Sequence, residues 1–467
     1  MKMHPHTYEA YQLFHEGTLA LAKAERQGIR FDYQKAIDSQ KEIDQRIKEL
    51  EQKIYDSKFF KRWQKISRTP VNIYSGKQLG EYLYKHLGVE VSVTTKTGMG
   101  ATSEEALKNL KIKEIQYLLK IRKLKKIRDT YLEQYIRENN NGVIHSNFNL
   151  SFVRTYRSSS SNPNFQNAPK RDEEARKYIR QCLLPRKGHQ FLEVDYGQLE
   201  VRISACYNQD KNLITDILHG DMHKDMAQEL FMLDNLDKSK KGHSTLRKAA
   251  KNGFVFPQFY GDYYKNCALI LASEWGKLPK KGRWKEGQGI EVEPEYYLSD
   301  HLIKHKIRSM DNFIDHVQRV EDRFWNERFR VYNKWKEQWY TKYQKKGYVD
   351  LKTGFRCVDL MSRNDAINYP IQGSAFHCLL WSFITIMSIL EERKMDTKIV
   401  NQVHDSILLD VHPDELESVV ELVVDVTTRQ LREHWDWIIV PLEIDAEYGE
   451  IDQPWYNLKP YPLPLKN

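Results

Sequence analysis

Apolar residues recur at helical spacing through the first third of the chain. The pattern runs from Ile37 to Ile54 and again from Ile112 to Ile136, with apolar positions every three or four residues. This spacing predicts two long amphipathic helices. Their polar faces are strongly basic, as in residues 120–126, and such a run is commonly a solvated helix face. We therefore expect residues 1–150 to be mainly helical.

Shorter apolar runs in the rest of the chain predict buried strands. Four runs have the length and composition of strands. They are Phe191 to Tyr196, Ile399 to Val403, Ile407 to Val411 and Val440 to Ile444. Residues from about 210 to 355, between the first and second runs, have a mostly helical pattern. The chain is therefore expected to combine a sheet with large helical parts.

Two further segments stand out by composition. Residues Trp275 to Tyr297 are rich in Gly, Lys and Pro, which predicts an exposed insertion between helices. The most apolar stretch, Phe376 to Leu390, is too short to span a bilayer and is interrupted by Ser and Thr. We interpret it as a core helix and expect no membrane association.

The net charge indicates what kind of partner the protein binds, and the cysteine content indicates the redox state of its compartment. The 467 residues carry a net charge of +9, from 73 basic and 64 acidic residues, and this balance favours a polyanionic partner. The five cysteines include no CxxC pair, which indicates a reducing compartment and no structural zinc. The N-terminus leads into a charged helical pattern and not into a signal peptide.

Two acidic segments lie at the ends of predicted strands. Asp195 follows the run ending in Val194, and Asp405 lies between two apolar runs separated by a two-residue bend. A strand-end aspartate is more often a turn former or cap. A sheet that brings two carboxylates together can also hold two divalent ions about 4 Å apart for phosphoryl transfer. The basic run Arg247 to Lys251 between them has the charge to hold a triphosphate.

These segments occur within an ordered series of motifs. The segments around Asp195, Arg247 and Asp405 resemble motifs A, B and C of the family A DNA polymerases, the group that includes bacterial DNA polymerase I. The other similar segments are residues 72–79, Thr95 to Gly98 with Thr102 and Ser103, residues 155–159 with 163–169, residues 221–223 and residues 368–374. The resemblance extends from about Leu19 to about Glu447.

The resemblance implies an α+β right-hand fold with an antiparallel palm sheet and mainly helical thumb and fingers. It assigns residues 1–150 to an N-terminal segment and thumb, and residues 151–209 to the first part of the palm with motif A. Residues 210–355 would form the fingers with motif B and an insertion near 275–297, and residues 356–467 the second part of the palm with motif C. Because no early stretch carries clustered Asp-x-Glu ligands, we expect no proofreading exonuclease in this chain.

The resemblance also implies roles for individual residues at the reaction centre. Asp195 and Asp405 match the catalytic metal ligands, and the backbone carbonyl of Tyr196 would add a further ligand. Carboxylate oxygens suit Mg²⁺, so two Mg²⁺ ions are expected, with Mn²⁺ as a substitute. Glu200 matches the steric gate that excludes a ribose 2′-hydroxyl, although it has Arg202 as an alternative partner.

Two more groups of residues match the family's substrate contacts. The nucleotide-binding group comprises Arg247, Lys251 and His223 for the phosphates, Glu200 for the sugar, Tyr260 for the base pair, and Phe254 and Phe256 as alternative stacking residues. The group for primer and template comprises Arg157, Asn164, Gln166, Asn167, Asn368, Gln372 and His404.

The chain departs from the family pattern in three places. Motif B is one residue longer and contains Pro257, which should kink or end the helix because proline lacks a backbone donor. Ser406 stands where the family commonly carries a glutamate, and Gly197 replaces a serine. These departures, with the insertion and the missing nuclease, suggest a phage or mobile-element branch, by analogy only.

The implied activity is template-directed DNA synthesis on a primer 3′ end with pyrophosphate release, in replication or repair. The implied partners are primer-template DNA and deoxynucleoside triphosphates; the protein would be a monomer, with accessory replication proteins, in the cytoplasm of a bacterial cell or phage-infected host. A metal-dependent nuclease would have no use for the basic helix, and a non-catalytic scaffold would not need both acids. The sequence leaves reverse transcription open.

Overall fold

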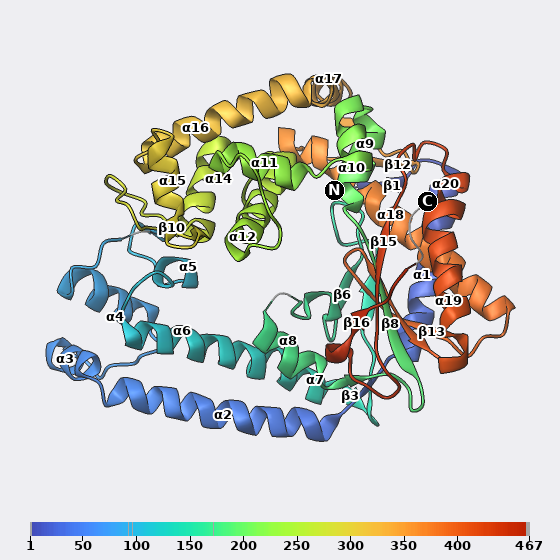
Figure 1. The fold of residues 1–467 in the computed structure, drawn as a ribbon. Helices are drawn as coiled ribbons and strands as arrows, with labels where there is room; N and C mark the ends of the chain where they lie inside the picture. Colours follow the sequence, from blue (N-terminus) through green and yellow to red (C-terminus); the bar gives the residue numbers. More distant parts are fainter. Residues whose placement is uncertain (1, 92, 96, 171, 464–467) are drawn as a thin grey trace.

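A computed structural model describes residues 2–91, 93–95, 97–170 and 172–463 (Figure 1). Lys96, within the motif Thr95 to Gly98, lies outside the described residues. Helices and antiparallel sheets are combined in the described chain, so the expected α+β class is confirmed.

Residues 33–137 form a long helical hairpin that extends away from the largest sheet and runs along the bottom of the view in Figure 1. Its two long helices, α2 and α6, pack along each other and share a separate hydrophobic core that includes Ile43, Ile47 and Leu118. Asp32 caps α2 by accepting a hydrogen bond from the Lys35 N–H. We call this hairpin the thumb; its elements are α2 (Tyr33–Tyr55), α3 (Lys58–Ile66), α4 (Gly76–Glu81), η1 (Tyr82–His86), α5 (Glu104–Leu107), α6 (Lys113–Lys125), η2 (Lys126–Leu132) and α7 (Glu133–Arg137).

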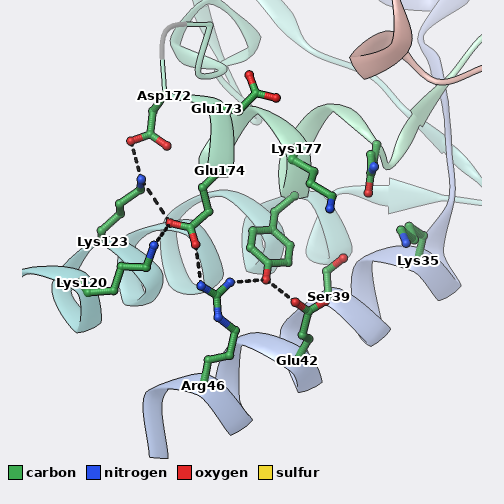
Figure 2. A pocket seen from close by; sticks show the side chains of 12 residues that line it. Lys35, Ser39, Glu42, Arg46, Lys120, Lys123, Asp172, Glu173, Glu174 and Lys177 are labelled. Carbon is green, nitrogen blue, oxygen red and sulfur yellow. Dashed lines mark hydrogen bonds and ion pairs between the residues drawn. The ribbon is translucent and has the colours of Figure 1, made fainter. Parts of the chain in front are cut away.

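An ion-pair cluster joins the base of the thumb to helix α8 (Glu173–Arg180) (Figure 2). Glu174 lies 2.7 Å from Arg46 on α2 and 2.6 Å from Lys120 on α6, while Lys123 reaches both Asp172 and Glu174. Burial acts to raise the pKa of Glu174, but hydrogen bonds from the cations outweigh it and lower that pKa to about 2. The cluster lines an open cavity of about 650 Å³ and fixes the thumb against the helix that precedes the first long strand.

The largest sheet has five antiparallel strands in the order β13-β14-β8-β15-β16, and we call it the palm sheet. Three of the four expected strands are confirmed. The fourth was predicted wrongly, because the strand begins at Ile444 while Val440 to Glu443 form no ladder. Pro441 has no N–H to donate there. The strands are β8 (Gln190–Tyr196), β13 (Lys398–Val403), β14 (Ser406–Val411), β15 (Ile444–Tyr448) and β16 (Lys459–Pro460).

Helices pack around the palm sheet, and one of them, α18 (Arg363–Glu392), is long and apolar enough to span a membrane. Helix α18 is 30 residues long, so it extends beyond the predicted stretch Phe376 to Leu390, and 72% of its apolar window is buried inside the protein. It packs against α1, α9 and α17, which fits a core helix. The helices nearest the palm sheet are α1 (Tyr8–Gln27), α9 (Leu199–Asn208), α18 (Arg363–Glu392), α19 (Leu416–Asp425), η8 (Val426–Gln430) and α20 (Leu431–His434).

A mostly helical part, here called the fingers, lies above the thumb in Figure 1. The segment Trp275 to Tyr297 is not exposed throughout, because Leu278, Trp284 and Val292 are buried. Its elements are α10 (Lys211–His219), α11 (Met222–Phe231), α12 (Lys241–Ala250), η4 (Lys251–Val255), α13 (Phe256–Tyr260), α14 (Tyr264–Ile270), η5 (Leu271–Trp275), β9 (Glu291–Glu293), β10 (Tyr296–Tyr297), α15 (Leu298–Lys304), α16 (Met310–Arg323), η6 (Phe324–Arg328) and α17 (Arg330–Lys346).

Short strands connect these parts. One small sheet pairs the N-terminal strand with a hairpin that precedes α18, and another joins the thumb to the segment leading into β8. The remaining elements are β1 (Lys2–Pro5), β2 (Ile29–Phe31), β3 (Asn139–Asn140), β4 (Val143–Ile144), β5 (Asn147–Asn149), β6 (Ser159–Ser161), η3 (Phe165–Asn167), β7 (Leu183–Leu184), β11 (Tyr348–Asp350), β12 (Phe355–Val358), η7 (Pro413–Glu415) and η9 (Trp455–Asn457).

Candidate active site

The palm sheet brings the two predicted catalytic acids together. Strands β8 and β14 are antiparallel neighbours, with Asp195 opposite Ser406, and the Tyr196 N–H donates to the Asp405 carbonyl at 3.1 Å. His404 and Asp405 form the predicted two-residue turn between β13 and β14, with His404 at a φ of +53°. Both acids therefore lie at the same end of the sheet, one at a strand end and one in the adjacent turn.

The surroundings of the two carboxylates differ. Burial and the nearby charge of Asp195 raise the pKa of Asp405, and Arg157 acts in the opposite direction. The Asp195 carboxylate has a close cationic partner, because its Oδ2 lies 2.8 Å from Lys170 Nζ. Lys170 was not among the predicted site residues, since nothing in the local sequence links it to a strand 25 residues away.

The donor set at this end of the sheet fits a hard cation. Asp195 and Asp405 offer carboxylate oxygens, and a bound cation would offset the effect of the Asp195 charge on the buried Asp405 carboxylate. In the part of the chain that the structure describes, no group of three or more His, Cys, Asp or Glu side chains is arranged to hold a metal. Mg²⁺ commonly uses one or two carboxylates and completes its shell with water and substrate phosphates, so two acids suffice.

A pocket of about 460 Å³ opens beside these acids, between the palm sheet and the fingers. Most of the predicted site residues line it. They are Arg157, Asp195, Tyr196, Glu200, Lys251, Phe256, Tyr260, Asn368, Gln372, His404 and Asp405. Six predicted residues are outside the lining, namely Asn164, Gln166, Asn167, His223, Arg247 and Phe254. Two larger cavities have different linings. The one at the thumb base includes neither Asp195 nor Asp405, and one of about 680 Å³ shares Asp195 but includes neither Asp405 nor Tyr260.

Glu200, in the first turn of α9, is held by two neighbours in the pocket. Its carboxylate forms an ion pair with Arg157 and accepts a 2.5 Å hydrogen bond from the Tyr260 hydroxyl. The alternative pairing with Arg202 is wrong, because Arg202 instead lies 2.8 Å from Glu443. The Glu200 side chain is therefore fixed at the pocket wall.

Behind the pocket, α11, α12 and η4 bring the side chains of His223, Arg247 and Lys251 near one another. Arg247 forms a 2.7 Å ion pair with Asp221, the N-cap residue of α11. His223 is buried and neither ring nitrogen has a hydrogen-bond partner. Burial and the charges of Lys251 and Arg247 lower the pKa of His223 to about 4, so the ring is neutral near pH 7. An unpartnered buried imidazole beside two cations is suited to an anionic ligand.

The extra residue of motif B is accommodated in a wide helical turn. Helix α12 passes into the π-helical turn η4 and then into α13, and Pro257 lies in the first turn of α13. The helix therefore does not end at Pro257, because a π-type turn accommodates the additional residue and a proline in a first turn needs no donor. Phe254 is fully buried against Phe324, whereas Phe256 lines the pocket with Lys251 Nζ 5.2 Å from its ring.

Helix α18 fixes the end of motif B. The Asn368 amide donates to the Tyr260 carbonyl and the Asn364 amide to the Gly261 carbonyl, both at 3.1 Å. Gly261 has a φ of +89°, and a Cβ added there would lie 2.4 Å from the Asn364 side chain. A glycine is therefore required after Tyr260 on both conformational and steric grounds.

On the opposite side, a polar network supports the Asp405 turn. The Gln166 amide donates to the Gln402 side-chain oxygen at 2.8 Å, and the Gln402 amide donates to the His404 carbonyl at 2.6 Å. Gln402 was missed as a functional residue although it belongs to motif C. Asn164 has a local structural role, because its side chain caps η3 by accepting from the N–H of Asn167, whose own side chain is exposed.

Comparisons with known proteins agree on one family. Two relatives are DNA polymerase I of Bacillus subtilis (strain 168), 29% identical over 449 residues, and DNA polymerase I of Geobacillus stearothermophilus, 28% identical over 456 residues. Each match covers 94% of this chain and 45% of the relative. The chain thus spans about half the length of these curated relatives.

A solved structure shares the fold. It is the POL domain of Pol1 from M. smegmatis in complex with DNA primer-template and dNTP, with a TM-score of 0.71 and 24% sequence identity, and the match covers 95% of this chain and 70% of that chain. The right-hand fold is therefore confirmed. The sequence model of DNA polymerase family A matches residues 34–273 and 304–456, and the gap between the two ranges contains the whole of the predicted insertion. The chain belongs to DNA polymerase family A.

Proposed function

We propose that this chain is a DNA-directed DNA polymerase that adds deoxynucleotides to the 3′ end of a primer paired with a template. The observation that carries this proposal is the position of Asp195 and Asp405 at one wall of a pocket whose other walls hold Lys251, Phe256 and Tyr260. Two acids beside a basic and aromatic wall match the needs of nucleotidyl transfer, in which a triphosphate is bound and its α-phosphate is attacked.

The acids of the palm sheet would bind the metal ions, and basic side chains of the fingers would bind the triphosphate. Asp195, Asp405 and the Tyr196 carbonyl would hold two Mg²⁺ ions, with Mn²⁺ as a substitute, and these ions would supply charge stabilisation at the attacking and leaving oxygens. Lys251 would bind the triphosphate from the fingers side, with Arg247 and His223 behind it.

The pocket wall supports selection of the sugar and the base pair. Glu200, fixed by Arg157 and Tyr260, would exclude a ribose 2′-hydroxyl by its bulk. Tyr260 would lie beneath the nascent base pair, and Phe256 would stack on the incoming base. Gln372, Asn368 and His404 line the same pocket and would contact primer or template, with Gln166 and Asn167 on the adjoining segment.

The proposal includes partners and setting. Primer-template DNA and deoxynucleoside triphosphates are the substrates, and the related POL domain was solved with both kinds of molecule. The basic thumb would contact duplex phosphates without reading sequence. We further propose a monomer that works in the cytoplasm of a bacterial cell or phage-infected host, with accessory replication proteins.

Primer extension by the full chain tests this function. Wild-type protein should lengthen a labelled primer with Mg²⁺ and four deoxynucleoside triphosphates, and Asp405→Ala should extend at least about 10³-fold more slowly because a stabilising contribution of several kcal/mol is lost. Asp414→Ala is a matched control, since Asp414 has a side chain 91% exposed on η7. DNA binding by Asp405→Ala should persist, because phosphate contacts dominate affinity. Full activity in Asp405→Ala would reject the assignment.

A further inference from the structure

A buried glutamate lies beside the two catalytic acids and has no role in the proposal above. Glu193 is 2% exposed, and its carboxylate has partners from four parts of the chain. The Trp455 indole N–H donates to Oε2 at 2.7 Å, and Arg180 Nη1 lies 3.4 Å from the same oxygen. At Oε1, Lys170 Nζ lies at 3.4 Å and the Ser406 hydroxyl at 3.3 Å. Such a complete set of partners is the condition under which a buried carboxylate is stable.

Two cations face the Glu193 carboxylate. Arg180 Nη1 lies 3.4 Å from one of its oxygens and Lys170 Nζ lies 3.4 Å from the other. Arg180 is itself buried and stacks on the Trp455 ring with 3.8 Å between its Cζ and the ring centroid. The carboxylate is therefore a fixed negative charge in the sheet next to Asp195.

The position of Glu193 relates it to the departure in motif C. Glu193 and Asp195 are two residues apart on β8, so their side chains lie on the same face of the sheet. Ser406, opposite Asp195 on β14, stands where the family commonly carries a glutamate. Its hydroxyl lies 3.3 Å from Glu193 Oε1, and its nearer acceptor is the Val403 carbonyl at 2.9 Å. A carboxylate is therefore present beside Ser406, but it is attached to the neighbouring strand.

We propose that Glu193 supplies from motif A the carboxylate that motif C lacks at Ser406, and that it is a positioning residue for Asp195 through Lys170. Lys170 Nζ is shared between Asp195 at 2.8 Å and Glu193 at 3.4 Å. Of these two carboxylates, only Asp195 would be left as a partner for Lys170 if Glu193 were removed. The Lys170 ammonium would then compete with a divalent cation for the Asp195 carboxylate. With Glu193 present, Lys170 can release Asp195 and stay at the edge of the site.

This inference rests on the proposed function, and it predicts a change in cation dependence and not only in rate. Glu193→Gln keeps the shape of the side chain and an acceptor for Trp455 but removes the charge. The Mg²⁺ concentration for half-maximal extension should rise by about 10- to 100-fold, the usual effect of losing a residue that supports a metal ligand. Glu447→Gln is the matched control. Glu447 lies on β15 directly opposite Glu193 of β8, and it is only partly buried.

A reciprocal exchange separates positioning from simple destabilisation. Ser406→Glu alone should weaken extension, since it adds a second carboxylate next to Glu193. In the double variant Glu193→Gln/Ser406→Glu, the Mg²⁺ dependence should return to within a few-fold of wild type. An unchanged Mg²⁺ dependence in Glu193→Gln, or a double variant no better than Glu193→Gln, would overturn the proposal.

A second measurement keeps this inference distinct from the proposed function. The increase in unfolding temperature caused by Mn²⁺ alone is recorded for the wild type, Glu193→Gln and the double variant, without DNA or nucleotide. The expected order is a large shift for the wild type, a small one for Glu193→Gln and a restored one for the double variant. Absence of extension by the wild type would reject the polymerase function, whereas equal Mn²⁺ shifts in all three proteins would reject the role of Glu193.

Discussion

Two phenylalanines of motif B, two positions apart, differ in their surroundings. Phe254 is fully buried against Phe324, with ring centroids 5.4 Å apart, whereas Phe256 lines the pocket near Lys251 and His223. Phe256→Ala should raise the KM for deoxynucleotides with little change in unfolding free energy. Phe254→Ala should instead lower the unfolding free energy by about 3–5 kcal/mol, as expected for a large cavity in a core.

These two variants serve as controls for each other. Steady-state kinetics of single-nucleotide addition and chemical denaturation are measured on both. If Phe254→Ala raised KM while Phe256→Ala left it unchanged, the assignment of Phe256 as the stacking residue would be wrong. The sequence left this choice open because both residues have the same type and neighbourhood, and only the turn of the helix distinguishes them.

The proposed role of Glu200 in excluding ribonucleotides is also tested at the residue scale. Glu200 is held by Tyr260 and Arg157, so its bulk stays at the pocket wall. Glu200→Ala should raise the ratio of ribonucleotide to deoxynucleotide use, measured as kcat/KM for each, by at least ~10-fold because a steric clash is removed. Tyr260→Phe, which removes only the hydrogen bond, should show a smaller increase. Equal ratios in Glu200→Ala and the wild type would reject the gate.

At the scale of elements, the sequence predicted the helices, strands and turns that follow from the local spacing of apolar residues. The amphipathic thumb helices and three palm strands follow from apolar spacing alone, and the Asp405 turn follows from two apolar runs separated by two residues. The fourth strand was placed too early because Val440 and Leu442 are buried like strand residues without joining a ladder. Burial produces the same apolar pattern with or without a strand.

The sequence could not predict contacts that depend on the packing of distant segments. Lys170 meets Asp195, and Glu193 meets Ser406, only because the segment before α8 packs against β8 and β8 pairs with β14. Gln402 was visible in motif C, but its role needs the position of Gln166 from another segment. Such partners have no periodicity or spacing that marks them in advance.

The wide turn in motif B gives an element-scale prediction. The π turn η4 carries one residue more than an α-helical path would need, and it sets the rotation of Lys251 relative to Tyr260. Deleting Asn252 should convert the wide turn into a regular helical turn and shift the residues within it, including Lys251, relative to Tyr260. Nucleotide binding should be lost while the far-ultraviolet circular dichroism stays close to that of the wild type.

The control for the deletion is Asn252→Ala, which keeps the length of motif B. Asn252 is only partly buried, so the substitution should leave nucleotide affinity near that of the wild type. Fluorescence titration with a deoxynucleotide in the presence of primer-template measures both variants. Normal affinity in the deletion variant would mean that the extra residue does not set the geometry of the pocket.

At the scale of the whole molecule, the thumb and fingers meet through exposed ion pairs. Lys108 on the thumb side lies 2.6 Å from Glu274 at the start of the segment that the family does not match, and Lys281 pairs with Glu90. Exposed pairs of this kind contribute about 0.2–1 kcal/mol each and are screened by salt. By contrast, the thumb base is held by the larger cluster around Glu174 (Figure 2). The thumb is therefore firmly attached at its base and weakly held at its tip.

This asymmetry predicts a salt-dependent opening between thumb tip and fingers. Fluorophores on Lys111→Cys and Lys285→Cys would report the separation by energy transfer, and the five native cysteines are all buried. Transfer should fall as salt rises, because the tip contacts are exposed, and Glu274→Gln should reach the same low transfer at lower salt. Glu391→Gln, which breaks the similarly exposed pair with Lys23 outside this contact, should behave like the wild type. Transfer that is insensitive to both salt and Glu274→Gln would show that packing, and not these ion pairs, holds the thumb tip against the fingers.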